Sequence, residues 1–88
     1  MIGFADEAWD AIQALLDDPT RETLADRLDA MLDVLEGDPG DARVRRHRMQ
    51  VPQLWYFVVT GSGETWTILW EPDSDDVPYV HYAGPGLA

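Results

Sequence analysis

The sequence predicts an α+β domain: an N-terminal antiparallel helical hairpin packed on a three- to four-stranded antiparallel sheet. Two observations predict this fold class. Apolar residues recur about every 3.6 positions up to residue 36, and they alternate with a period of two after residue 42. Helices grouped before strands, with short connections, favour a helical layer on one face of a sheet. The chain has 88 residues, which is enough for one domain.

The helical hairpin is predicted from two amphipathic segments. The first covers residues 4–17, and Asp18 as N-cap with Pro19 after it begins a second over residues 19–36. Gly37 and a turn over residues 38–41 end the second helix. So short a link between the helices makes them antiparallel. We expect one apolar stripe to pack against the sheet, formed by Leu24, Leu28, Met31, Leu32 and Leu35 together with Trp9, Ile12 and Leu16.

Four strands are predicted, over residues 43–51, 54–60, 64–71 and 77–82, and residues 83–88 are expected to be a frayed tail. The second strand is the strongest, and the Gly-Ser-Gly sequence after it suits a hairpin loop. This strand is apolar on both faces. Either it is central and covered on both sides, or its second face is a docking surface.

Composition and charge narrow the function classes. There are seventeen acids, six arginines and no lysine, and the net charge of −11 argues against a general polyanion binder. The absence of cysteine excludes disulfides and thiol nucleophiles. No segment is apolar enough to span a membrane, and the N-terminus is acidic where a signal peptide is basic. We therefore expect a cytoplasmic protein without a membrane contact, and no cofactor motif is recognisable.

A basic segment over residues 43–48 stands out from the acidic chain. In a strand, Arg46 and Arg48 project to one side with Val44, and the alternate residues Arg43, Arg45 and His47 project to the other. Two interpretations follow. The arginines pair with the acid-rich helices, or they bind a phosphate or an acidic partner.

Three other groups of residues have both a structural and a functional interpretation. His81 is either a surface histidine on an edge strand or an acid–base group near Arg46, Arg48 or Glu71. The acids of the turn at 73–76 lack the glycine and distal glutamate of a calcium loop, so we expect a solvated turn and no metal. The strand aromatics belong to the core, or they stack bases or dock a protein: Trp55, Tyr56, Phe57, Trp66, Trp70, Tyr79 and Tyr82.

The order of these elements resembles the RelE/ParE toxin superfamily of bacterial toxin–antitoxin systems, over about residues 5–84. The resemblance rests on the leucine stripe of the second helix, the Asp38-Pro39 turn, the arginine-bearing segment 43–48, the strands 54–60 and 64–71, and a final strand ending in His81-Tyr82. Members of the family usually begin with a β-strand before the helices. Residues 1–3 are too short to supply a good one, so we expect none here.

The resemblance implies a compact sheet that carries the active residues and a cognate antitoxin that wraps the toxin. In ribosome-dependent members the sheet face cleaves mRNA, which would make this chain an endoribonuclease. The matching catalytic positions are Arg46, Arg48, His81 and Tyr82. The function hypotheses are thus a RelE/ParE-like toxin, or a diverged and non-catalytic relative, that acts on mRNA, the ribosome or another macromolecule. The alternative is a non-catalytic protein–protein interaction module that uses the exposed sheet face to bind another protein or to form a homodimer.

Overall fold

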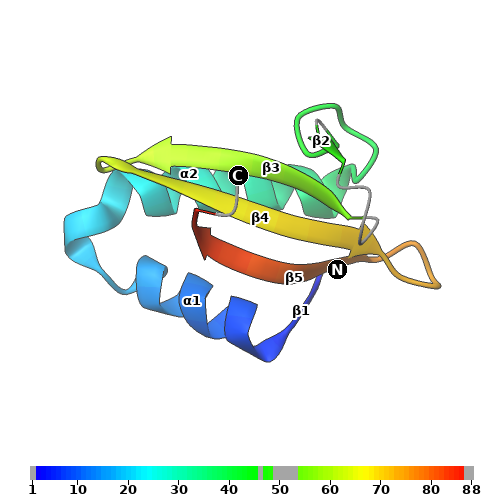
Figure 1. Cartoon of the computed structure of the whole chain (residues 1–88), viewed down its shortest axis with the longest axis horizontal. Coiled ribbons are helices and arrows are strands. Elements are labelled where there is room, and N and C mark those ends of the chain that lie inside the picture. The colour runs from blue at the N-terminus through cyan, green and yellow to red at the C-terminus, as the bar shows by residue number, and fades with distance from the viewer. Residues whose placement is uncertain (1, 46, 49–53, 87–88) are drawn as a thin grey trace.

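The chain folds into two helices and a five-stranded sheet (Figure 1). The structure is a computed structural model, and it describes residues 2–45, 47–48 and 54–86. The elements in chain order are β1 (Gly3–Phe4), α1 (Asp6–Leu16), the 3₁₀ turn η1 (Pro19–Arg21), α2 (Glu22–Gly37), β2 (His47–Arg48), β3 (Trp55–Gly61), β4 (Glu64–Pro72) and β5 (Pro78–Pro85). The predicted α+β class is confirmed, and the predicted sheet layout is not.

The sheet is mixed, where three or four antiparallel strands were predicted. Its strand order is β1-β5-β4-β3-β2, and β1 runs parallel to β5. The two residues of β1 suffice because α1 begins just beyond them, and the N–H of Ala5 donates to the carbonyl of Val80 at 2.8 Å. Gly3 allows the close approach, since a Cβ there would lie 2.8 Å from the Tyr79 ring. The expectation that no strand precedes the helices is therefore wrong.

Local signals explain where the helices begin and end. Asp18 accepts a hydrogen bond from the N–H of Thr20, as an N-cap does, and Pro19 follows it. These residues open the turn η1, so α2 itself begins at Glu22, three residues after the predicted start. The first helix starts later than predicted because Phe4 is part of β1.

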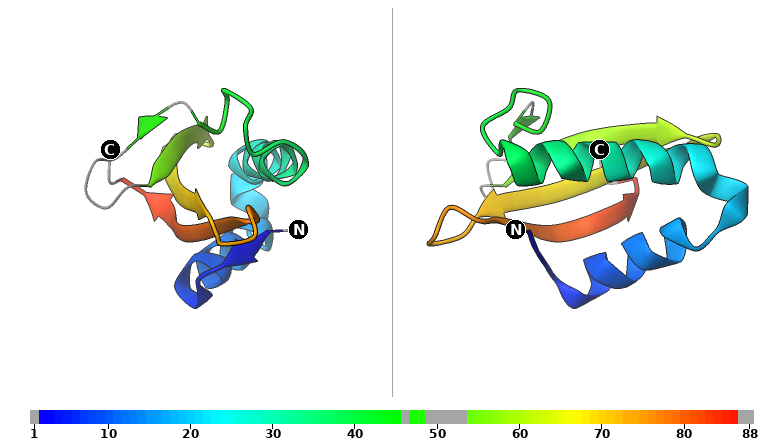
Figure 2. Two further views of the ribbon diagram at one scale, coloured as in Figure 1. Left: turned by 90° about the vertical axis from the view of Figure 1, so that its right-hand side faces the viewer. Right: turned by 180° about the vertical axis from the view of Figure 1, so that it is seen from behind.

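Both helices lie on one side of the sheet, α1 along β5 and α2 along β3 (Figure 2). Trp9 and Leu16, predicted to be in the core, are 46% and 42% exposed. Each of them directly follows a buried residue of α1, Ala8 or Leu15, so its side chain points away from the buried stripe. The Trp9 ring contacts the Phe4 ring. Neither helix in the described part of the chain is long and apolar enough to cross a membrane. The buried side chains between helices and sheet include Ala8, Ile12, Leu15, Leu24, Leu28, Leu35, Phe57, Val59, Trp66, Ile68, Trp70 and Val80.

Two predicted boundaries in the C-terminal half are wrong. Residues 43–45, predicted to begin a strand, form a turn in which Val44 is buried and its carbonyl accepts the Nε1–H of Trp70 at 2.9 Å. Residues 46 and 49–51 of that predicted strand lie outside the described residues. At the other end β5 continues to Pro85, where a frayed tail was expected from residue 83. Gly84 makes this possible because the Tyr82 ring covers it, leaving no room for a Cβ.

The β3–β4 hairpin fits against the beginning of α2. Its two-residue loop, Ser62 and Gly63, has φ values of 52° and 77°, which is the type I′ turn that suits the twist of a hairpin. A Cβ at Gly61 would lie 2.8 Å from the backbone nitrogen of Leu24, so glycine is needed for this approach. The N–H of Leu24 donates to the Ser62 hydroxyl at 3.4 Å.

Candidate functional site

The basic segment lies in the turn before β2 and in β2 itself. The guanidinium of Arg43 donates twice to the carboxylate of Asp41, at 2.8 and 3.0 Å, and these bonds lower the pKa of Asp41 to about 2. Arg45 donates to the Pro39 carbonyl at 2.7 Å and lies over the rings of Trp55 and Trp70. Arg43 therefore pairs with an acid of its own turn, and Arg45 is bound to the backbone and to aromatic rings. The predicted site residue Arg46 lies outside the described residues.

Arg48 projects from the helix side of the sheet at its edge. It pairs with Trp55, which in turn pairs with the buried Trp70, and directly opposed residues share a face. The Arg48 guanidinium lies 5.0 Å from the centre of the Trp55 ring. Arg48 and Arg45 thus flank one tryptophan.

His81 and Tyr82 project from the other face, which we call the outer face because α1 and α2 cover its opposite. The β4–β5 register shifts between Leu69 and Trp70, so that Tyr82 pairs with Leu69 while Val80 pairs with Trp70. His81 is the extra residue of this bulge. Its Nε2 lies 2.8 Å from a carboxylate oxygen of Glu71, and its ring meets the edge of the Tyr79 ring.

The structure therefore does not bring Arg48 and His81 together. The strands β3 and β4 lie between their strands, and three spacings of about 4.8 Å separate the two backbones by about 14 Å. The two side chains also leave the sheet on opposite faces. One phosphodiester cannot contact both, so the described part of the predicted catalytic site is not assembled. His81 and Tyr82 do share a face, although the Tyr82 hydroxyl donates to the Pro85 carbonyl at 3.0 Å.

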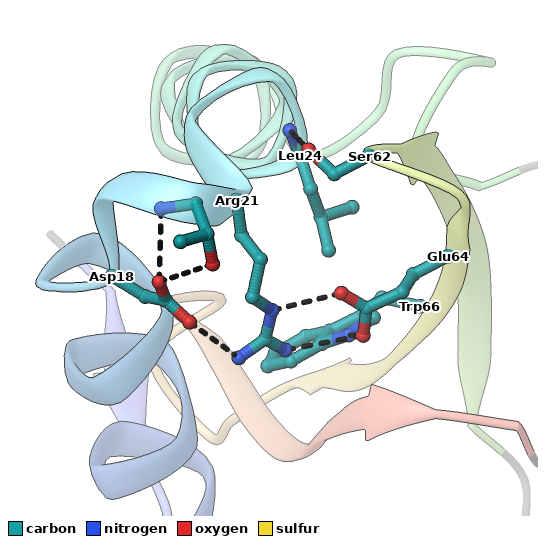
Figure 3. Close-up of polar contacts among 7 residues, drawn as sticks. Asp18, Arg21, Leu24, Ser62, Glu64 and Trp66 are labelled. Atoms are coloured by element: carbon teal, nitrogen blue, oxygen red, sulfur yellow. Dashed lines mark hydrogen bonds and ion pairs between the residues drawn. The ribbon is translucent and has the colours of Figure 1, made fainter.

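Arg21 is held in a polar cluster between η1 and the β3–β4 hairpin (Figure 3). Its guanidinium donates to both carboxylate oxygens of Glu64, at 2.8 and 3.2 Å, and lies 3.6 Å from Asp18. It also lies over the Trp66 ring. The hydrogen bonds to Glu64 raise the pKa of Arg21, so it stays charged. This cluster joins the helical and sheet layers, and its cation is engaged within the protein.

As far as the structure describes the chain, the outer face presents aromatic side chains and no guanidinium group. One row crosses four strands through the paired residues His47, Tyr56, Leu69 and Tyr82, which we call the outer row. The His47 and Tyr56 rings stack at 4.8 Å. Val58, also on this face, is 42% exposed. Sequence reasoning placed His47 on the face opposite Arg48, and the register agrees. It did not foresee that Tyr56 lies under the histidine ring.

Metal chemistry has little support in the part of the chain that the structure describes. No three ligating side chains from His, Asp and Glu come together among residues 2–45, 47–48 and 54–86. In the turn after β4, Asp73 accepts hydrogen bonds from the N–H groups of Asp75 and Val77, at 2.8 and 3.0 Å. The carboxylate therefore closes its own turn.

In comparisons with known proteins, no family model, curated protein or solved structure matches the chain.

Proposed function

We propose that the protein is a non-catalytic protein–protein interaction module that binds its partner with the outer face of the sheet. One observation carries this proposal: both helices pack on the same face, and the opposite face presents His47, Tyr56 and Tyr82 of the outer row with Val58 beside them, whereas Leu69 of that row is buried. Aromatic side chains of this kind are typical anchors of protein interfaces.

The charges favour a protein over RNA as the partner. RNA binding needs cations that contact phosphates, and the chain has six arginines, no lysine and seventeen acids. Arg21 and Arg43 are each bonded to a carboxylate, and Arg45 and Arg48 lie against tryptophan rings. None of these four leaves the sheet on the outer face.

A RelE/ParE-like toxin, or a diverged relative, is the second candidate. The strand β1 favours it, because members of that family usually begin with a strand before the helices. The His81–Glu71 contact could serve acid–base chemistry on mRNA, with Tyr82 nearby. In that case the partner is a cognate antitoxin, and the outer face could belong to that interface. The separation of Arg48 from His81 speaks against a catalytic form.

The test compares substitutions on the outer face with a matched one elsewhere. Tyr56→Thr with Val58→Thr removes aromatic and apolar surface while keeping residues that suit a strand. Trp9→Gln, on the exposed flank of α1, is the control. We expect the outer-face variant to lose the partners that the wild-type protein retains from a native lysate, and the control to keep them. Undiminished capture by a folded outer-face variant would refute the proposal.

Two further measurements in the same experiment separate the alternatives. Sedimentation at several concentrations shows whether the partner is a second copy of the chain. Growth on expressing the wild type or His81→Ala addresses the toxin candidate. Toxicity that disappears with His81→Ala would favour catalysis over the interaction module.

A further inference from the structure

Beyond Tyr56, no strand among the described residues pairs with the outer edge of β3. Within the described residues β2 pairs only with Trp55 and Tyr56, and β2 is the last strand of the sheet (Figure 1). The type I′ hairpin makes Gly61 and Glu64 a hydrogen-bonded pair, and such pairs alternate along an antiparallel ladder. The N–H and C=O groups of Val58 and Thr60 therefore point away from β4. The Thr60 carbonyl confirms this direction, since it accepts Nη1–H of Arg27 at 2.7 Å.

A groove runs along this edge between β3 and α2. It consists of two adjoining hollows of about 410 and 310 Å³, and Met31 and Val58 line both. Phe57, Val59 and Ala30 add to the apolar lining. An open strand edge beside an apolar groove is the arrangement into which other proteins accept an added strand.

The charged residues of the groove are all basic. Arg27 lines one end, and Arg43 and His47 line the other. None of the described acids lines either hollow, although the chain has seventeen acids. Arg27 makes no ion pair with any residue the structure describes, and its one hydrogen bond there is to Thr60. Arg43 is bonded to Asp41, and its side chain is 65% exposed.

We propose that an extended segment of another protein adds to the open edge of β3, with an apolar residue over Met31 and carboxylates toward Arg27 and Arg43. This inference goes beyond the proposed function, because it adds a contact at the edge of β3, on the helix side, to the one proposed for the outer face. At about 3.3 Å per residue, carboxylates four residues apart are about 13 Å apart, one step longer than the stretch of about 10 Å from Phe57 to Thr60. Guanidinium groups bind carboxylates in two-pronged geometry. Arg27 can offer it, because only its Nη1 is used in the bond to Thr60, whereas Nε and Nη2 of Arg43 already hold Asp41.

A second copy of the chain fits this edge less well. Two β3 edges paired antiparallel about a two-fold axis would bring Arg27 of one copy toward Arg43 of the other. Each copy also carries a net charge of −11, which opposes their approach at low salt.

The probe is the capped heptapeptide TETVTET, whose sequence is the same in both directions, so that its side chains suit a parallel or an antiparallel approach. Alternate side chains place its two glutamates and its valine on one face. The controls TQTVTQT and TKTVTKT change only the charge. In an NMR titration of the whole protein, we expect TETVTET to shift the amide signals of Val58 and Thr60 and slow their hydrogen exchange. It should bind at least about threefold tighter than TQTVTQT, as exposed ion pairs allow.

Backbone pairing is tested by N-methylation of the peptide. In an added strand, the backbone N–H groups of every second residue point toward β3, and those of the residues between them point away from it. Methylating one set should abolish binding, and methylating the other should not. Equal effects of the two sets would overturn strand addition, as would the absence of binding at about 5 mM TETVTET or equal or tighter binding of TKTVTKT.

The role of Arg27 is tested on the protein side. Arg27→Gln should weaken TETVTET about two- to fivefold and leave TQTVTQT unchanged, which also shows that the groove is intact. Arg27→Lys should keep part of the preference. An undiminished preference for TETVTET in Arg27→Gln would refute the assignment. The proposed function is tested separately by Tyr56→Thr alone, because Tyr56 lies on the outer face and lines neither hollow. If this variant loses the natural partner while no peptide binds the edge, strand addition fails and the proposed function stands.

Discussion

Asp41 and Arg43 show how single residues turn the chain between α2 and β2. The Asp41 carboxylate accepts the backbone N–H of Arg43 at 2.8 Å as well as two bonds from its guanidinium. An aspartate that bonds the backbone two residues on closes a local turn. This turn buries Val44 beneath β4, and it prevents residues 43–45 from extending as the strand that the alternating sequence predicts.

The first prediction concerns the pH dependence of this turn. The pKa of Asp41 is about 2 in the folded protein, below the ordinary value of 3.8. Ionised Asp41 therefore stabilises the fold above about pH 4, and this contribution is lost as the pH falls from about 4 to about 2. Asp41→Asn keeps the acceptor for the backbone but lacks the charge. The difference in melting temperature between wild type and Asp41→Asn should be constant at higher pH and shrink over that window.

Arg43→Gln provides the control because it removes the main cause of the lowered pKa. In that background, Asp41→Asn should produce a much smaller change with pH. A wild-type difference that stays constant down to pH 2 would show that the ion pair does not contribute to stability in solution.

At the scale of elements, α2 is held to β3 by a short apolar stripe. Leu28 lies in the middle of the helix and is fully buried against the sheet, whereas Leu16 at the end of α1 is 42% exposed. We predict that Leu28→Ala lowers the free energy of unfolding by about 2–4 kcal/mol, because truncation loses apolar burial and leaves a cavity. Leu16→Ala should cost less than about 1 kcal/mol, since most exposed substitutions are mild. Denaturant titration measures both.

A loss below about half a kcal/mol for Leu28→Ala would contradict the packing of α2 on the sheet. An equally large loss for Leu16→Ala would mean that the end of α1 is covered in solution, by a partner or by a second copy. The pair of substitutions thus separates burial within the fold from burial in an interface.

The elements that the sequence could predict are those whose signals are local. The periodicities of residues 19–36, 54–60 and 64–71 locate α2, β3 and β4 to within a few residues. The strand β1 was missed because two residues carry no periodicity, and only its parallel partner β5 makes it a strand. The end of β5 was missed because a glycine such as Gly84 usually indicates the end of a strand. In the structure, glycine is needed there because the Tyr82 side chain leaves no room for a Cβ.

The candidate site depends on relations that the local pattern does not contain. Alternation separates Arg48 from His47 correctly, but the strand order and the β4–β5 bulge decide which of them shares a face with His81. A bulge shifts the register by one residue, and the residue types at Leu69 and Trp70 give no sequence signal for it. The apolar second face of β3 suggests a docking surface from the strand alone, and that stays a prediction.

At the scale of the whole molecule, charge is distributed unevenly between the layers. Twelve of the seventeen acids precede residue 43, and they lie mainly in and between the helices. Asp29 has Asp26 and Asp33 as neighbours three and four positions away on the same helix surface. In the part of the chain that the structure describes, Asp18 lies close to Arg21, which is also bonded to Glu64, and Asp41 is bonded to Arg43. Folding therefore brings like charges closer together than they are in the expanded chain.

The last prediction follows from this repulsion. At about 0.01 M salt the Debye length is about 30 Å, so the charges act across the whole molecule, whose radius of gyration is 12.2 Å. At about 1 M it is about 3 Å, and only close pairs still interact. Because repulsion outweighs the few ion pairs, the melting temperature should rise with sodium chloride over this range. Sodium chloride is preferred to sulfate, since sulfate also strengthens apolar burial. Asp29→Asn removes two like-charge contacts, so it should raise the melting temperature at low salt and reduce its salt dependence. A melting temperature that falls as salt is added would mean that ion pairs such as Arg21–Glu64 dominate the electrostatics of the fold.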